Sequence, residues 1–316
     1  MSVGGNWVTI PYVDTTIRNE VEKINIDAIL IRDVPLAPLC SYRTGGDADL
    51  LGTPSNLSEL RALLAYASEH GLSITVLGGG TNVLVSDRGV RGLTILTTRL
   101  HQVHVRGTLL CAQAGLSVDK TIQIAIEHSL CGLELLGGLP GTIGGAVRGN
   151  AGANGVWLSD FVEWVDYIDM DGTLGRVFRS EMDFSYKHSC FSSNNYVIYE
   201  VVLRLIPNKE TSEAMRMREQ SRRKRFVAGQ FDYPSAGCMF KNPEGYSAGK
   251  LIDQAKLNTL TVGGAAVSHK HANFIINRSG DATSMDMYRL SQQIAEHVEK
   301  SEHIKLEREV QLIGQW

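Results

Sequence analysis

The sequence predicts a protein that mixes α-helices with β-strands and is divided into two or three domains. Its 316 residues correspond to that number at about 100–200 residues per domain. The spacing of apolar residues changes repeatedly between a helical period and short β-type runs. With 43% hydrophobic and 21% charged residues, the composition is that of a globular protein and excludes a disordered chain.

The N-terminal part begins with residues 1–38, which we expect to be a loosely structured lead-in. A helix is predicted to open at Pro54–Ser55 and to end at Gly71, because its apolar residues recur at helical spacing: Leu57, Leu60, Leu64 and Ala67. A short buried strand at 74–77 follows and leads directly into three successive glycines.

The middle part combines one helix with a run of strands. Ser117 is predicted to cap a helix that Gly132 closes, with Val118, Ile122 and Ile126 on its apolar face. The β-type runs that follow are 162–168, 174–178 and 196–205. Asp171-Gly172 lies between the first two runs and predicts a hairpin.

The C-terminal part begins at a predicted boundary near Pro207-Asn208-Lys209. A basic helix is expected over about 211–226. A second helix begins near Thr283, capped with the help of Asp286, and its apolar face is Met287, Leu290, Ile294 and Val298. A last strand is expected over about 305–313.

Charge and cysteine usage exclude several classes of protein. The net charge is −3, from 31 basic and 34 acidic residues, so we expect no nucleic-acid partner and no anionic membrane surface. No apolar run reaches the length of a membrane span, and the first twenty residues do not have the pattern of a secretory signal. The five cysteines are scattered without a C-x-x-C, which predicts no metal site and a cytoplasmic location.

Two glycine-rich loops carry most of the functional information. The first is GGGTNVLVSD at 78–87, and the second is GGLPGTIGGAVRGNAGANG at 137–155. Successive backbone N–H groups in such loops can hold an anion, so two loops suit a ligand with two phosphates and a long body, such as a dinucleotide. The Rossmann fingerprint and the P-loop are both absent. The alternative is that these glycines only make tight turns.

Seven segments resemble one enzyme family and occur in its order from about residue 39 to the C-terminus. They are SYRTGGDADL (41–50), GGGTNVLVSDRGVRGL (78–93), GLPGTIGGAVRGNAGANG (138–155), FSYKHSCF (184–191), SAGCMFKNP (235–243), VSHKHANFIIN (267–277) and LEREVQLIG (306–314). The sequence is similar to the UDP-N-acetylenolpyruvoylglucosamine reductases, in the shorter type that lacks an extra substrate-covering loop.

The resemblance implies an α+β architecture with the FAD-binding fold of the p-cresol methylhydroxylase and vanillyl-alcohol oxidase type. Two α+β subdomains, about 39–97 and 98–207, would form the FAD-binding domain. An α+β domain over 208–316 would bind the substrate. The family holds FAD non-covalently and uses NADPH to reduce UDP-N-acetylglucosamine enolpyruvate to UDP-N-acetylmuramate for peptidoglycan, so the expected partner is a nucleotide sugar.

The same resemblance assigns residues to roles. The flavin would contact the two loops at Gly78, Gly79, Gly80, Thr81, Asn82, Val83, Gly138, Pro140, Gly141, Gly144, Gly145, Asn150, Ala151 and Gly155. Cys238 falls at the proton donor, Lys187 at the cation that receives the substrate carboxylate, and Glu309 at a second acid. Tyr186 and Asn242 are expected to contact the substrate.

Two positions depart from the family pattern. Lys187 stands where arginine is usual and offers a point charge rather than a bidentate fork, so Arg179 or Arg204 could supply a fork instead. Gln311 also replaces a usual arginine.

Other sites and other functions remain open from the sequence. His269 and His271 could contact the substrate diphosphate or only pack, and the run Arg222 to Arg225 could be a solvated helix face that also attracts the diphosphate. One alternative function is an FAD oxidase of the same fold acting on an alcohol or lactone. The other is a non-catalytic protein that binds a nucleotide sugar or a flavin.

Overall fold

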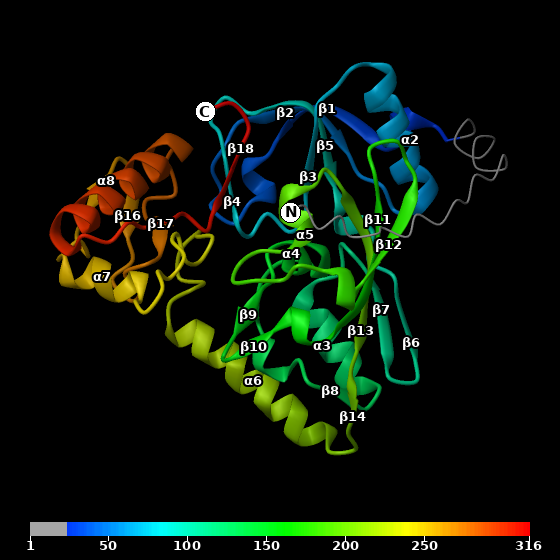
Figure 1. The fold of residues 1–316 in the computed structure, drawn as a ribbon. Coiled ribbons are helices and arrows are strands. Elements are labelled where there is room, and N and C mark those ends of the chain that lie inside the picture. Colours follow the sequence, from blue (N-terminus) through cyan, green and yellow to red (C-terminus); the bar gives the residue numbers. More distant parts are fainter. Residues whose placement is uncertain (1–23) are drawn as a thin grey trace, which may run out of the picture. The chain divides into compact units, whose positions relative to one another are not determined.

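The structure is a computed structural model that describes residues 24–316, and the chain divides into two compact units (Figure 1). The first unit contains the described residues up to Ile31 together with Leu51–Gly79 and Leu93–Arg222. The second unit contains Arg32–Leu50, Gly80–Gly92 and Arg223–Trp316.

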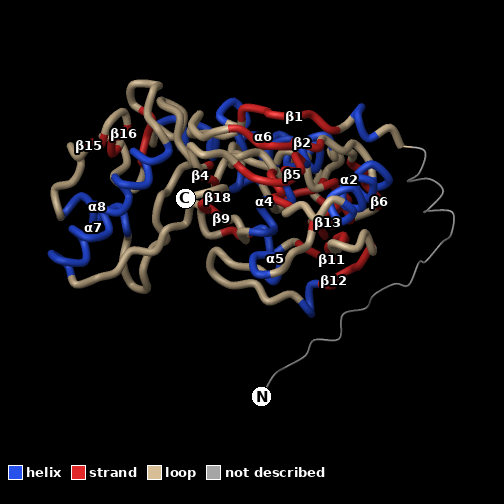
Figure 2. The backbone as a smooth tube through the Cα atoms, turned by 90° about the horizontal axis from the view of Figure 1, so that it is seen from above, coloured by secondary structure: helices blue, strands red, loops and turns tan. Residues whose placement is uncertain are grey.

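The first unit is built around a five-stranded antiparallel sheet with the order β12-β11-β13-β7-β6 (Figure 2). Its strands are β6 Val103–Arg106, β7 Leu109–Gln113, β11 Val162–Ile168, β12 Leu174–Phe178 and β13 Val197–Arg204. The predicted hairpin is confirmed, because β11 and β12 pair across the Asp171-Gly172 turn. Helices α3 and α4 contribute buried apolar residues to the core that this sheet also forms.

Smaller elements complete the first unit. The helices are α2 Leu57–Glu69, α3 Val118–Glu127, α4 Ile143–Arg148 and α5 Cys190–Ser193, and α6 Thr211–Val227 continues into the second unit. Short strands are β8 Leu130–Cys131, β9 Gly152–Ala153, β10 Val156–Trp157 and β14 Ile206–Pro207. Short 3-10 helices of the whole chain are Ile26–Ala28, Ala37–Leu39, Thr97–Arg99, Glu134–Leu136, Leu158–Asp160 and Arg179–Glu181.

A second sheet has the order β1-β2-β5-β3 and contains the parallel pair β3 and β5. Its strands are β1 Leu30–Pro35, β2 Asp47–Gly52, β3 Ile74–Leu77 and β5 Val90–Leu96. The predicted strand at 74–77 is confirmed. Residues 1–23 of the expected lead-in lie outside the described residues. The expectation of loose structure was wrong for Leu30–Pro35, which forms the regular strand β1. Pro35 is tolerated there because it ends the strand.

Local hydrogen bonds determine where the helices begin and end, and these positions differ from those that the glycines predicted. In α2 the Asn56 side chain accepts from the Glu59 N–H at 2.9 Å, so the helix begins at Leu57. Ser117 caps α3 as predicted, and its Oγ accepts from the Lys120 N–H. However, α3 ends at Glu127 rather than at Gly132, because Ser129 turns the chain at φ +58° into strand β8.

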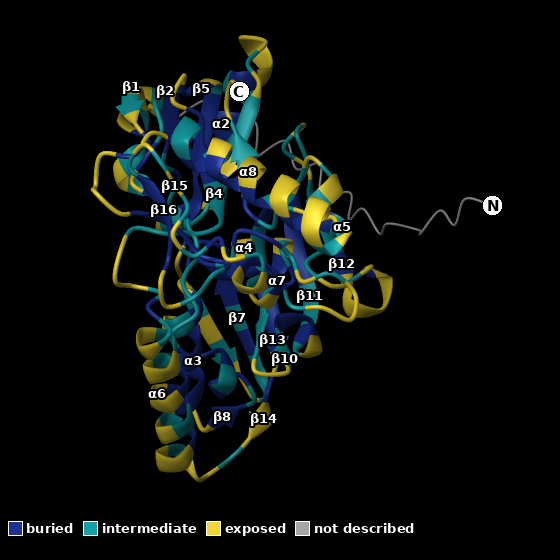
Figure 3. Ribbon diagram, turned by 90° about the vertical axis from the view of Figure 1, so that its left-hand side faces the viewer, coloured by how far each residue is buried: buried dark blue, intermediate teal, exposed yellow. Residues whose placement is uncertain are grey.

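The second unit packs a three-stranded antiparallel sheet against two helices. The sheet has the order β15-β16-β17, with β15 Thr261–Val262, β16 Ala265–Val267 and β17 Ile275–Asn277. The helices are α7 Ala248–Gln254 and α8 Ser284–Glu302. The predicted apolar face of α8 is fully buried, and Figure 3 shows how such buried positions alternate with exposed ones along the helices.

The last predicted strand is shorter than expected. Only β18 Gln311–Ile313 is regular, and it pairs in parallel with β4 Val83–Val85. The preceding residues are extended without a continuous ladder, since Arg308 makes an isolated bridge to Phe240. Leu306 and Val310 are buried while Glu307 is exposed, as the two faces of an extended chain require.

We predict that Thr283→Ala destabilises the second unit by about 1 kcal/mol. Thr283 Oγ1 accepts from the Asp286 N–H at 3.0 Å, and the Asp286 carboxylate accepts from the Thr283 N–H at 3.0 Å, so the variant breaks a capping box. Thermal unfolding would measure the change. Ser301→Ala, at the exposed far end of the same helix, is the control and should leave the melting temperature almost unchanged.

Candidate cofactor and active site

The two glycine loops touch each other backbone to backbone within the first unit. A Cβ atom added to Gly78 would lie 2.6 Å from Thr142 Oγ1, and one added to Gly79 would lie 3.1 Å from Gly141 Cα. No side chain therefore fits between the loops without moving one of them. The glycines are required here by close approach, whatever ligand the loops hold.

The second loop is fixed in position by the segment that precedes α3. Gly144 N–H donates to the Ala114 carbonyl at 2.9 Å and Ile143 N–H to the Leu116 carbonyl at 2.8 Å. In the other direction, Val118 N–H donates to the Gly141 carbonyl at 3.0 Å. This pairing fixes the conformation of the loop before any ligand binds.

Several polar groups beside this contact have no partner in the described part of the chain. The N–H groups of Gly79, Gly141 and Thr142 donate to no acceptor among the residues that the structure describes. Asn150 is buried at φ +40°, and its Oδ1 lacks a hydrogen bond in the same part of the chain. Free N–H groups beside a bare backbone suit an anion, and a buried acceptor suits a ligand N–H or O–H, so these residues fit FAD.

Three of the predicted flavin contacts have another reason to be glycine. The Gly138 N–H already donates to Asp119 Oδ1 at 2.8 Å. A Cβ on Gly144 would meet the Ala114 side chain at 2.7 Å, and one on Gly80 would meet the Leu39 carbonyl. These positions are therefore constrained by packing of the chain, and their contact with a cofactor stays a prediction.

The remaining predicted flavin contacts are divided between the two units. Thr81, Asn82 and Val83 belong to the second unit, where the Asn82 side chain donates to the Glu309 carbonyl at 3.3 Å. The others belong to the first unit: Pro140, Gly145, Ala151 and Gly155. A Cβ on Gly155 would meet no atom within 4 Å, although its φ of +81° favours glycine.

Lys187 occupies a strained tight turn in the first unit. Ser185 and His188 exchange both backbone hydrogen bonds, at 3.1 and 3.2 Å, and Lys187 between them has φ +56°. A non-glycine residue in this region costs roughly 1–2 kcal/mol. Such strain is typical of functional positions.

The second glycine loop and the Lys187 turn are joined by side chains that the sequence did not indicate. Asn150 Nδ2 donates to the Ser185 carbonyl at 3.0 Å. The hydroxyls of Ser189 and Ser192 both donate to the Arg148 carbonyl at 2.7 Å. The structure thus brings Lys187 and Tyr186 into one cluster with the end of the loop, and the Tyr186 ring contacts Trp157 edge-on.

The two alternative arginine forks are held elsewhere in the first unit. Arg179 Nε donates to the Ser159 carbonyl at 3.0 Å and its guanidinium lies over the Phe184 ring. Arg204 binds Glu163 through two nitrogens on the sheet surface. Both guanidiniums are therefore engaged within the first unit, and the role of Lys187 stays a prediction.

Cys238 and Glu309 come together in the second unit. Met239, which follows Cys238, accepts from the Glu309 N–H at 2.8 Å through its carbonyl, and its own N–H donates to the Asn273 carbonyl at 2.8 Å. Cys238 itself makes an isolated bridge to Phe274. Gln311 donates its side-chain amide to the Glu309 carbonyl at 3.1 Å, so this departure from the family pattern supports the same segment.

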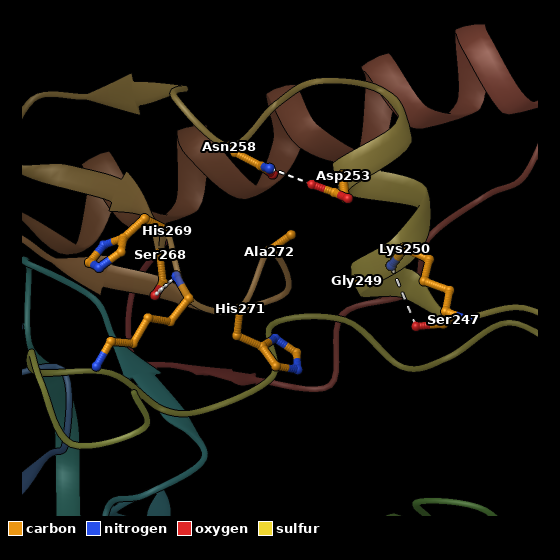
Figure 4. A pocket seen from close by; sticks show the side chains of 10 residues that line it. Ser247, Gly249, Lys250, Asp253, Asn258, Ser268, His269, His271 and Ala272 are labelled. Atoms are coloured by element: carbon orange, nitrogen blue, oxygen red, sulfur yellow. Dashed lines mark hydrogen bonds between the residues drawn. The ribbon is translucent and has the colours of Figure 1, made fainter. Parts of the chain in front are cut away.

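Asn242 and a cavity of about 320 Å³ both contact the start of α7. Asn242 Oδ1 accepts from the Ala248 N–H at 2.9 Å. Figure 4 shows the cavity between α7 and the 268–272 segment, and its walls are Ser247, Gly249, Lys250, Asp253, Asn258, Ser268, His269, Lys270, His271 and Ala272.

His271 presents a hydrogen-bond donor at this cavity. Burial lowers the pKa of its imidazole below the ordinary value, so the ring is neutral at pH 7. The Asn273 N–H donates to His271 Nδ1 at 3.3 Å, which assigns the ring proton to Nε2. Nearby, the Lys270 ammonium binds Asp232 at 2.7 Å.

Arginines of the basic run on α6 are held by neighbouring side chains, and the histidine pair belongs to no metal cluster of the described residues. Arg222 binds Glu219 at 2.7 Å, and Arg225 donates to the Gln230 side chain at 3.4 Å. Over residues 24–316, His, Cys, Asp and Glu side chains nowhere gather in threes that could hold a metal ion. No helix in that range has the length and apolar character that crossing a membrane requires.

Comparison with known proteins matches both parts of the chain. The family model for the C-terminal domain of UDP-N-acetylenolpyruvoylglucosamine reductase matches residues 229–313, and the FAD binding domain model matches residues 48–177. The UDP-N-acetylenolpyruvoylglucosamine reductase of Lactiplantibacillus plantarum is 39% identical over 89% of this chain and 92% of its own length. That of Caldanaerobacter subterraneus is 36% identical over 94% and 98%.

A solved structure shows the same fold. The crystal structure of UDP-N-acetylenolpyruvylglucosamine reductase from Thermus caldophilus aligns with a TM-score of 0.76 and 33% identity, over 90% of this chain and 98% of that one. These matches show that the chain belongs to the UDP-N-acetylenolpyruvoylglucosamine reductase family.

Proposed function

We propose that this protein uses NADPH and non-covalently bound FAD to reduce UDP-N-acetylglucosamine enolpyruvate to UDP-N-acetylmuramate in peptidoglycan precursor synthesis. The observation that carries the proposal is the contact between two glycine loops with unpaired N–H groups, in a chain that matches this reductase family along its length. NADPH oxidation that depends on the enolpyruvyl sugar tests it. Reduced flavin that is reoxidised faster by oxygen than by the enolpyruvyl sugar would favour the alternative, an oxidase acting on an alcohol or lactone.

The flavin diphosphate is assigned to the glycine loops. The N–H groups of Gly79, Gly141 and Thr142 would hold its oxygens, and Asn150 Oδ1 would accept from a ligand N–H or O–H. When bound, FAD supplies a carrier that takes hydride from NADPH and passes it to the vinyl carbon of the substrate.

Three side chains of this chain are assigned to the substrate chemistry. Cys238 donates a proton to the ether-bearing carbon, because a thiol with an ordinary pKa of about 8.5 is protonated at neutral pH. Lys187 neutralises the substrate carboxylate. Glu309 is assigned as the second acid, and its backbone contact with Met239 supports a shared site with Cys238.

The cavity beside α7 is assigned to the substrate diphosphate. The neutral His271 ring offers its Nε2–H, and Lys250 adds positive charge from α7, the helix that also carries Asp253; Lys270 is paired with Asp232. Asn242 and Tyr186 are assigned as further substrate contacts. This assignment favours a ligand role for His271 over plain packing.

The proposed domain boundaries, location and partners accompany these site assignments. Residues 39–207 would form the FAD-binding domain and 208–316 the substrate-binding domain. A cytoplasmic location, where NADPH and the nucleotide sugar are both found, fits the five free cysteines of the described chain. We propose no nucleic-acid partner, since the net charge is −3 and two of the α6 arginines, Arg216 and Arg222, are paired with Glu213 and Glu219 of the same helix.

We predict that Gly79→Val abolishes flavin binding, because the added side chain would push the Gly79 and Gly141 backbones apart. Visible absorbance of the purified variant measures flavin occupancy. Gly149→Val is the control, because Gly149 is not among the predicted flavin contacts, has φ −91°, and an added Cβ would meet only the Gly145 carbonyl, at 3.7 Å. Full occupancy in Gly79→Val would show that the loop contact does not hold the cofactor.

We predict that Lys187→Gly lowers activity while it keeps or raises stability, by up to about 1 kcal/mol. Glycine adopts φ +56° without strain but carries no charge for the carboxylate. Steady-state kinetics should show a raised KM and a lowered kcat, and thermal unfolding should show no loss. Lys187→Ala should lose as much activity without the gain in stability. Wild-type kinetics in both variants would exclude Lys187 from the site.

We predict that Cys238→Ala leaves flavin reduction by NADPH near the wild-type rate and slows reoxidation by the enolpyruvyl sugar. The loss should be about 10²–10⁴-fold, the usual contribution of a positioned general acid. Stopped-flow absorbance separates the two half-reactions. Cys238→Ser should retain part of the activity. A thiol donor makes the rate fall at high pH, and the serine variant should not show this fall. Equal reoxidation rates in Cys238→Ala and the wild type would make Cys238 a packed thiol.

A further inference from the structure

Asp119 fixes the first part of the second glycine loop. It is the second residue of α3, and its Oδ1 accepts from the Gly138 N–H at 2.8 Å. Three residues further on, Gly141 begins the stretch that pairs with the segment before α3. The stretch 138–141 of the loop is thus held at both of its ends, and only Leu139 and Pro140 lie between the two attachments.

Arg218 of helix α6 holds Asp119 in turn. Its Nε donates to Asp119 Oδ1 at 3.1 Å and its Nη2 to Oδ2 at 2.6 Å, which is a bidentate ion pair. The Arg218 side chain is only 8% exposed, although α6 is mostly exposed along its length (Figure 3). Arg222 adds a second guanidinium 3.7 Å from the same carboxylate.

The backbone of α6 also lies directly against the loop. A Cβ on Gly137 would meet the Arg218 carbonyl at 2.5 Å, and one on Gly138 would meet the Arg222 side chain at 2.7 Å. The two glycines therefore let the loop approach the helix closely enough for the ion pair to reach it. A carboxylate beside an anion-binding loop would repel a diphosphate, and the two arginines cancel that charge.

We propose that Asp119 and Arg218 are positioning residues for the cofactor, which hold the second glycine loop in its diphosphate-binding conformation before FAD arrives. This rests on the proposed function, in which Gly141 and Thr142 bind the FAD diphosphate. Because the Gly138 N–H donates to Asp119, this N–H is not available to contact the cofactor. Preorganisation of this kind strengthens binding by reducing the ordering that the ligand must impose.

The test is the dissociation constant of FAD, measured by the fluorescence of flavin released when the holoenzyme is diluted. Asp119→Ala should raise it by about 10–100-fold, since a hydrogen bond to a charged group contributes about 1.5–3 kcal/mol. The kcat at saturating FAD should stay near wild type. Arg218→Lys, which keeps the charge but loses the bidentate geometry, should raise the constant by a smaller factor and serves if Asp119→Ala does not fold.

Asp166→Ala is the matched control. Asp166 forms a bidentate pair with Arg176, at 2.6 and 2.9 Å, in the same unit but on strands β11 and β12. It should cost stability without changing FAD affinity. In hydrogen exchange of the flavin-free proteins, amides of residues 137–142 should exchange faster in Asp119→Ala than in Asp166→Ala.

The outcomes separate this proposal from the proposed function. Wild-type FAD affinity in both Asp119→Ala and Arg218→Lys, together with flavin loss in Gly79→Val, would overturn the positioning role and leave the cofactor site standing. An equal loss of affinity in Asp166→Ala would overturn it too, because the effect would then be general destabilisation. Retained flavin in Gly79→Val would instead overturn the placement of the cofactor.

Discussion

The structure of the first unit depends on a backbone contact that admits no side chain. Gly78 and Gly79 lie against Gly141 and Thr142, so both loops must approach at the distance of bare peptide groups. The pairing of 141–144 with the segment before α3 provides that approach without help from a ligand. An anion site made of peptide N–H groups carries no net charge of its own, which suits a chain whose charges are otherwise nearly balanced.

The same contact organises the chemistry around it. Asn150, in the second loop, donates to the Ser185 carbonyl and so holds the turn that carries Lys187, the residue proposed as the cation. Asn82, in the part of the first loop that belongs to the second unit, donates to the Glu309 carbonyl. Each loop thus supports one of the assigned catalytic side chains through an asparagine amide, and a change in either loop would reach the chemistry as well as the cofactor.

The sequence predicted the elements whose signals are local. Strands 162–168 and 174–178, the Ser117 cap and the capping box of α8 all match the structure, because each depends on neighbouring residues. It did not predict the bond from Asp119 to Gly138, the burial of Arg218, or the strain at Lys187. Those features arise from contacts between residues distant along the chain, and an arginine within a basic run gives no local sign that it is buried. The close packing of Gly144 on Ala114 is another such contact.

The parallel pairing of β18 with β4 has a consequence for biosynthesis. Gln311 lies opposite Val83, so a strand within the first glycine loop must wait for a partner more than 220 residues further along the chain. During translation the N-terminal partner of this pair leaves the ribosome long before its C-terminal one, and contacts of such high sequence separation form late. The emerging chain would therefore carry an unpaired β4 edge until β18 has been made, and deletion of residues 311–316 would remove the partner that covers it.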